Sequence, residues 1–114
     1  MSTVTLLSRP KDKNPVEVVS NRVQTFSCTT NAIRPSSRIQ WYLSTTNMRT
    51  SASPQLDVCN SDCSDDKVIS SSVLTYTGNK NDEGKILYCT AVNIEGQSVV
   101  RSSEKTIVIW CKYY

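Results

Sequence analysis

The chain has 114 residues, a formal net charge of +3 and 38% hydrophobic residues, which suffices for one small packed core and leaves no room for a second. Its 13 basic residues are scattered among 10 acidic ones without a Lys/Arg run, so the charge does not argue for nucleic acid. No apolar run approaches the roughly 18 residues of a membrane span, and residues 1–14 show no signal-peptide pattern. We therefore expect Met1 to mark an artificial start or the start of an excised domain.

Turn signals such as Asn14-Pro15, Arg34-Pro35 and Gly78-Asn79 recur at short spacing, and no segment shows a sustained 3.6-residue apolar period. Short strands between regular turns predict an all-β chain. In chain order, we expect strands over residues 4–7, 16–19, 23–30, 38–43, 68–77, 86–93 and 98–110, the last one broken near 101–104. The polar stretch 44–67 is expected to hold a short strand and an irregular loop.

Successive side chains of a strand point to opposite faces, so alternation separates a core side from an outer side. The inward set is Phe26, Cys28, Ile39, Trp41, Leu43, Leu87, Cys89 and Ala91. The outward set is Arg38, Gln40, Tyr42, Ile86, Tyr88, Thr90 and Val92.

Cys28 and Cys89 are 61 residues apart in strand-like sequence, and Trp41 follows Cys28 by 13 positions. This arrangement resembles an immunoglobulin sandwich, in which cysteines on strands B and F bridge the two sheets and a tryptophan on strand C packs on the bridge. The resemblance implies a two-sheet Greek-key sandwich with a Cys28–Cys89 disulfide. It implies a single domain over residues 1–110, a tail over 111–114, and a core that includes Trp41, Leu87, Phe26 and Ile39.

The run DEGKILYCTAVN at residues 82–93 resembles the D-x-G-K-x-L-x-C-x-A-x-N run of C2-set immunoglobulin domains in nephrin- and nectin-like adhesion receptors. Residues 34–43 (RPSSRIQWYL) and 72–76 (SVLTY) are similar to strands C and E of those domains, and the similarity covers roughly residues 16–110. Leu87 stands where variable-type domains carry their corner tyrosine, which argues against that subtype. The resemblance implies an extracellular recognition domain of an adhesion or immune-type receptor.

Five cysteines in so short a chain favour an oxidising, extracellular location. Cys59 and Cys63 lie in the polar loop DVCNSDCSDD. Two thiolates are too few ligands for zinc and the chain has no histidine, so we expect a local disulfide there. Cys111 is expected to be a free thiol or to pair with a segment outside this sequence, with a cross-link between two chains as the alternative.

Four acidic residues crowd the same loop: Asp57, Asp62, Asp65 and Asp66. Oxygen ligands in a loop are able to hold calcium, but the spacing fits no EF-hand, and we interpret the loop as a solvated acidic one. No metal and no cofactor is predicted. Catalysis is not expected, because the usual general base, histidine, is absent and the three glycines form no phosphate-binding pattern.

Tyr42, Tyr88, Ile86 and Val92 make the outer face more apolar than solvent requires, which is typical of an interface. Arg38 and Gln40 would form its polar rim. The alternative is that another strand, a long side chain such as Arg38, or a neighbouring domain covers the tyrosines. The turn of Ile94, Glu95, Gly96 and Gln97 is either a ligand contact or only a tight turn.

These residues predict contact with a protein partner or with a second copy of the chain, and no membrane insertion. The alternatives are a passive spacer in a multi-domain receptor and a secreted binder of microbial glycans.

Overall fold

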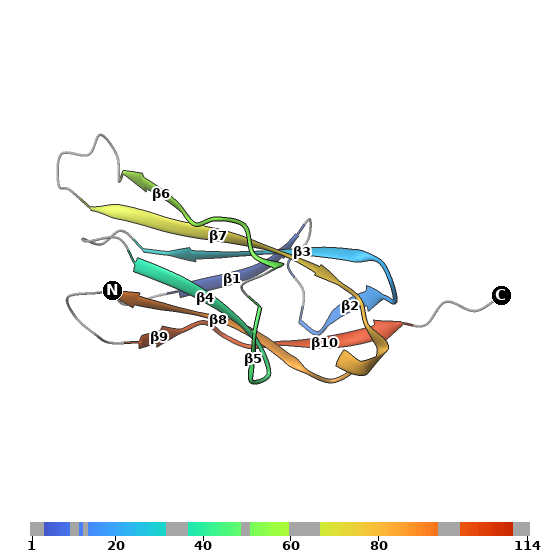
Figure 1. The fold of residues 1–114 in the computed structure, drawn as a ribbon. Coiled ribbons are helices and arrows are strands. Elements are labelled where there is room, and N and C mark those ends of the chain that lie inside the picture. Colours follow the sequence, from blue (N-terminus) through green and yellow to red (C-terminus); the bar gives the residue numbers. More distant parts are fainter. Residues whose placement is uncertain are drawn as a thin grey trace.

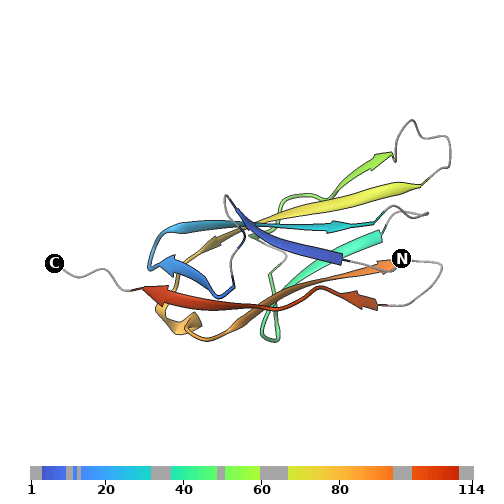
Figure 2. The same cartoon turned by 180° about the vertical axis from the view of Figure 1, so that it is seen from behind.

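The computed structural model of the protein describes residues 4–9, 12, 14–31, 37–48, 51–59, 67–93 and 99–110. Two β-sheets pack face to face, as Figures 1 and 2 show from opposite sides. The strands are β1 Val4–Arg9, β2 Val16–Val19, β3 Val23–Thr30, β4 Ser37–Leu43, β5 Thr46–Asn47, β6 Leu56–Cys59, β7 Val68–Thr77, β8 Ile86–Asn93, β9 Val99–Arg101 and β10 Lys105–Trp110. A 3₁₀ turn, Lys80–Asp82, joins β7 to β8.

One sheet has the order β1-β3-β7-β6, and the other has the order β2-β10-β8-β4-β5, with β9 also paired to β8. The element types follow the sequence closely. The strands over residues 16–19, 23–30, 68–77 and 86–93 begin and end where they were expected. The expected break in the last strand is confirmed as the gap between β9 and β10. The described part of the stretch 44–67 holds two short strands, β5 and β6, where one was expected.

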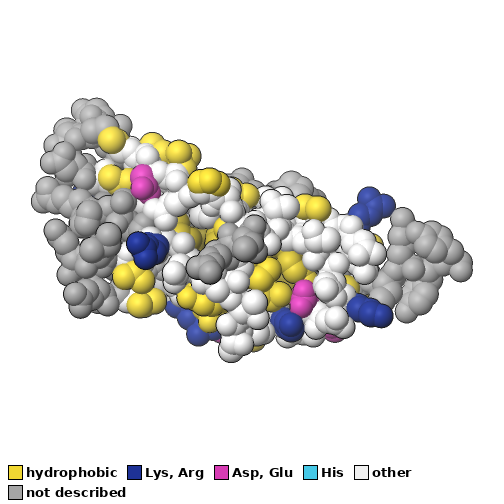
Figure 3. Space-filling view, viewed as in Figure 1, with side chains coloured by type: hydrophobic (Ala, Val, Ile, Leu, Met, Phe, Trp, Pro, Cys, Tyr) yellow, Lys and Arg dark blue, Asp and Glu magenta, His cyan; other side chains and the backbone are white. Residues whose placement is uncertain are grey.

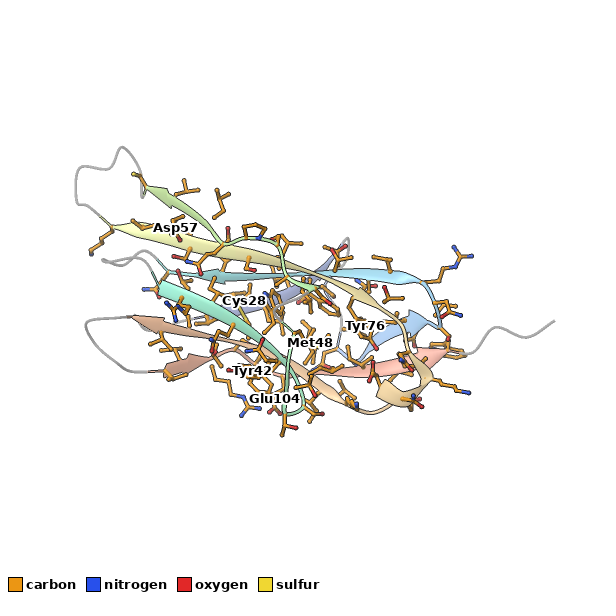
Figure 4. All side chains as sticks on the ribbon, viewed as in Figure 1. Cys28, Tyr42, Met48, Asp57, Tyr76 and Glu104 are labelled. Atoms are coloured by element: carbon orange, nitrogen blue, oxygen red, sulfur yellow. A yellow bond between two sulfur atoms is a disulfide. The ribbon has the colours of Figure 1, made fainter. Side chains whose placement is uncertain are left out.

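The core lies between the two sheets and is built from the inward side chains of both. Among the hydrophobic residues that the structure describes, eight are at most 1% exposed: Phe26, Cys28, Trp41, Leu74, Leu87, Cys89, Ala91 and Ile107. The expected disulfide is present, since Cys28 on β3 and Cys89 on β8 are bonded with a Cα–Cα distance of 6.4 Å (Figure 4). Ile39 is partly buried and packs against this cluster rather than inside it.

A buried hydrogen bond also links the sheets. Trp41 on β4 donates from its indole Nε1 to Ser72 Oγ on β7, at 3.0 Å. Tyr76 on the same strand is 4% exposed and donates from its hydroxyl to Asp82 at 2.7 Å. Burial raises the pKa of Tyr76, and the hydrogen bond to the Asp82 carboxylate adds to the rise.

The N-terminal segment crosses from one sheet to the other. β1 pairs antiparallel with β3, whereas β2 pairs parallel with β10. Between them Asn14, which precedes a cis Pro15, accepts from the backbone N–H of Thr106 at 3.0 Å. Lys105 is 5% exposed, and its Nζ lies 2.6 Å from Asp12 Oδ1. The hydrogen bond from Lys105 is the main cause that holds the pKa of Asp12 below its usual range. These contacts tie the crossing segment to the start of β10.

The last strand is interrupted at residues 102–104, and Ser102 is the first residue outside the regular strand. Its backbone N–H donates to the carbonyl of Cys89 at 2.9 Å, and its Oγ accepts from the Cys89 N–H at 3.0 Å. The Ser102 side chain therefore supplies an acceptor to β8 where the backbone of the last strand departs from regular pairing.

Candidate recognition surface

The outer face of β4, β8 and β9 carries the residues that the sequence singles out for recognition. The register pairs Tyr42 with Tyr88, and Arg38 with Val92. Paired residues share a face, so all six predicted residues lie on the side away from the core. We call this surface the tyrosine face; its members are Arg38, Gln40, Tyr42, Ile86, Tyr88, Val92 and Arg101.

The two tyrosines are stacked and partly exposed. Their ring centroids are 5.4 Å apart and their planes differ by 18°. The Tyr42 hydroxyl donates to Gln40 Oε1 at 2.9 Å, so Gln40 fixes the position of the Tyr42 hydroxyl. Stacking and this hydrogen bond restrict both side chains before any partner arrives, which lowers the conformational entropy lost on binding.

Arg101 on β9 is the member of this surface that sequence reasoning missed. Its guanidinium carbon lies 3.7 Å from the centroid of the Tyr88 ring, which is cation–π geometry. It also forms an ion pair with Glu104, in which both side chains are about half exposed. The register pairs Arg101 with Thr90, which places it on the outer face two residues along β8 from Tyr88. Extending the alternation of β8 to its neighbour would have found it.

The alternative expectation was that another part of the protein, such as the Arg38 side chain, covers the two tyrosines. In the structure Arg38 is exposed, and Arg101 lies over Tyr88 instead. Thr90 faces outward as expected but is only 8% exposed, because Gln40 and Arg101 flank it on the neighbouring strands. Figure 4 labels Tyr42 and Glu104 on this part of the ribbon. The surface is thus partly covered by its own arginine and still open to solvent.

The apolar members lie at the two ends of the surface. Ile86 and Val92 are half-buried, and Val99, which pairs with Val92, is 63% exposed. An aromatic stack between aliphatic ends, with arginines beside it, has the composition of an interface centre.

A cleft of about 210 Å³ opens beside the tyrosine face, at the edge of β4 that β5 leaves unpaired. Arg38 and Gln40 line it together with Gln55. Gln55 Oε1 accepts from the backbone N–H of Ile39 at 2.8 Å, and its Nε2 donates to Asp57 at 2.8 Å. The Gln55 side chain therefore occupies a position that a further strand would take.

The opposite sheet also exposes apolar side chains, on the outer side of β6 and β7. Leu56 and Val58 are 61% and 50% exposed, and Val73 is 40% exposed. In Figure 3, hydrophobic side chains gather along the upper edge, over these two strands. They carry no aromatic ring and no arginine, which sets them apart from the tyrosine face.

Several expected features lie wholly or partly outside the described residues. The turn of Ile94, Glu95, Gly96 and Gln97, and the residues Cys63 and Cys111, belong to that part of the chain. Cys59 is disulfide-bonded, and its pairing with Cys63 stays a prediction. Of the four loop carboxylates, the structure describes Asp57 alone.

Among the residues that the structure describes, no cluster of three or more metal-ligating side chains is found. None of the helices there is long and apolar enough to cross a membrane.

Two sheets bridged by a disulfide between β3 and β8, with Trp41 packed in the core, define an immunoglobulin-like β-sandwich. The chain belongs to the family of CD80-like C2-set immunoglobulin domains, which matches residues 8–99. Domains of this kind are generally non-enzymatic and mediate protein–protein contacts, and the disulfide indicates an extracellular location.

Two solved structures resemble the chain in fold. The crystal structure of Rst D1-D2 matches with a TM-score of 0.76 and 13% identity, over 93% of this chain and 48% of that one. The ectodomain of mouse nectin-like molecule 4, containing Ig1–Ig3, matches with a TM-score of 0.71 and 17% identity, over 96% of this chain and 34% of that one. The chain thus spans about half and about a third of these structures. No curated protein matches the sequence.

Proposed function

We propose that the domain is an extracellular recognition module that binds a protein partner through the tyrosine face. One observation carries the proposal: Tyr42, Tyr88 and Arg101 form a continuous stack on an exposed sheet face. Tyrosine and arginine are enriched among the residues that dominate binding energy at protein interfaces. A stack held by its own contacts supports binding, because fewer rotamers have to be frozen on association.

The family and its structural neighbours support the same proposal at a coarser level. The solved neighbours are multi-domain assemblies, a D1-D2 pair and an Ig1–Ig3 ectodomain. We therefore place the domain in a longer adhesion or immune-type receptor, where it contacts either another protein or a second copy of itself. An exposed aromatic face is also what separates this role from that of a passive spacer.

The test uses the domain as a fluorescent tetramer, applied to an array of receptor ectodomains that includes the domain itself. The double variant Y42S/Y88S removes both rings. We expect it to weaken binding roughly thirtyfold, the equivalent of about 2 kcal/mol for hot-spot residues. The matched control L56S/V73S removes two exposed apolar side chains from the opposite sheet, and it is expected to bind like wild type.

Circular dichroism and urea unfolding verify that both variants fold. Binding that survives Y42S/Y88S in a folded protein would refute the proposal. So would a failure of the wild-type tetramer to bind any ectodomain, which indicates a spacer, or binding confined to a glycan array. Solution mass measured by light scattering, with and without reductant, separates pairing through this face from a cross-link through Cys111.

A further inference from the structure

We propose that the partner segment is acidic and that Arg101 is the residue that selects it, receiving a partner carboxylate in place of Glu104. This inference rests on the proposed function. It adds the chemistry of the partner and assigns a specificity-determining role to Arg101.

The first argument is the way in which Arg101 is held. The central carbon of its guanidinium lies over the Tyr88 ring, 3.7 Å from the ring centroid, and Tyr88 is stacked in turn on Tyr42. A guanidinium fixed by stacking keeps its edge N–H groups in one plane, which suits the two oxygens of a carboxylate. The Arg101 side chain is still 50% exposed, so a partner has access to those donors.

The second argument is Glu104, which already supplies a carboxylate to Arg101 from three residues further along. Its side chain is 47% exposed. Ion pairs at this level of exposure contribute little to stability, because water and salt screen both charges. Glu104 therefore acts as an internal stand-in that a partner carboxylate is able to displace at small cost, and it marks the position that such a carboxylate would take.

The third argument is the charge of the surface. Among the described outward residues of β4, β5, β8 and β9, the charged ones are Arg38 and Arg101, and Glu104 follows in the gap before β10. None of the ion pairs between described residues involves Arg38. A second copy of the chain would bring the same arginines against each other, whereas an acidic partner complements both. Charge complementarity of this kind controls partner choice and association rate.

The experiment titrates the ¹⁵N-labelled domain with acetyl-hexaglutamate amide, and with acetyl-hexaglutamine amide as the uncharged probe. We expect hexaglutamate, and not hexaglutamine, to shift the resonances of Arg101 and Tyr88 before those of other residues. The variant R101Q should weaken binding by about fivefold, the upper range for one exposed ion pair. The variant E104Q should strengthen it, because the competing carboxylate is gone.

R22Q is the matched control, since Arg22 is also exposed but lies in the turn between β2 and β3. It is expected to leave the titration unchanged. Equal losses in R101Q and R22Q, or shifts spread evenly over all basic residues, would overturn the inference. So would a wild-type dimer, seen by light scattering, that R101Q abolishes.

Failure of this inference is distinguishable from failure of the proposed function. An ectodomain whose binding depends on Tyr42 and Tyr88 but is unchanged by R101Q and E104Q would leave the recognition role standing and refute the acidic partner. If Y42S/Y88S, R101Q and E104Q all fold and all leave binding unchanged, both the recognition role and the acidic partner are refuted.

Discussion

Replacing Ser72 with alanine tests whether the two sheets are joined by a polar contact as well as by apolar packing. Ser72 is 5% exposed and Trp41 is 1% exposed, so the S72A variant leaves the indole N–H buried without its acceptor. A buried donor deprived of its partner destabilises a protein by about 1–3 kcal/mol. With an m-value of about 2 kcal/mol/M in urea, a loss near 2 kcal/mol lowers the unfolding midpoint by about 1 M.

The assay is urea unfolding at 25 °C, with S71A as the control. Ser71 lies next to Ser72 on β7 but points outward, and its hydroxyl donates to the carbonyl of Leu56 over a long distance of 3.5 Å. We expect S71A to change stability by less than about 0.5 kcal/mol, as surface substitutions do.

A double-mutant cycle with W41F isolates the hydrogen bond. In the W41F background no indole N–H exists, so S72A should cost about 1 kcal/mol less than it does in wild type. If W41F does not fold, the indole proton of Trp41 in S72A, followed by NMR, reports the lost bond instead. Equal costs of S72A in both backgrounds, or an S72A variant as stable as S71A, would refute the reasoning.

Two further predictions concern the covalent and electrostatic ties of the fold. Closing a loop between residues 61 positions apart contributes about 4 kcal/mol by chain entropy, so C28A/C89A should lower the free energy of unfolding by that order, measured by urea unfolding. If the double variant is unfolded in buffer, both proteins are compared in added sulfate, which strengthens apolar burial. The pKa of Asp12 is lowered in the folded state, so its stabilising effect is present above pH 4 or so and is lost as the pH falls through the folded pKa. The stability gap between wild type and D12N should therefore be full at pH 7 and shrink as the pH falls below about 4 through the lowered pKa of Asp12. A gap that stays constant with pH would contradict the role of the Lys105–Asp12 pair.

The sheets were predictable because alternation and turn chemistry act locally. Four strands begin and end at the expected residues, and the sides assigned to Trp41, Leu87 and Phe26 are those found. One short strand was expected within residues 44–67, but the positions of β5 and β6 were not predicted, because two- and four-residue strands carry almost no periodic signal. All four residues of β6 are exposed, and the alternation of Leu56 and Val58 with Asp57 is too short to mark a strand.

The tyrosine face was predictable as a set of positions but not as a set of contacts. Alternation along β4 and β8 assigns Tyr42 and Tyr88 to the same outer face, and the observed register places them side by side. The stack, the hydrogen bond to Gln40 and the approach of Arg101 depend on rotamers and on the path of β9, which no local pattern encodes. The contact of Gln55 with the edge of β4 was not predictable either, because its hydrogen bond to Ile39 joins residues 16 positions apart.

The break between β9 and β10 is the physical link between the fold and the candidate site. In a straight strand, residues three apart lie about 10 Å from each other and point to opposite faces, so Arg101 and Glu104 would not form an ion pair. The departure of the chain at Ser102 brings them together, and the Ser102 hydroxyl keeps the N–H of Cys89 bonded while it does so. The irregularity therefore lies beside Cys89, one of the two cysteines of the buried disulfide. A guanidinium anchored there meets a partner with little freedom to lose, which is what a residue that selects its partner requires.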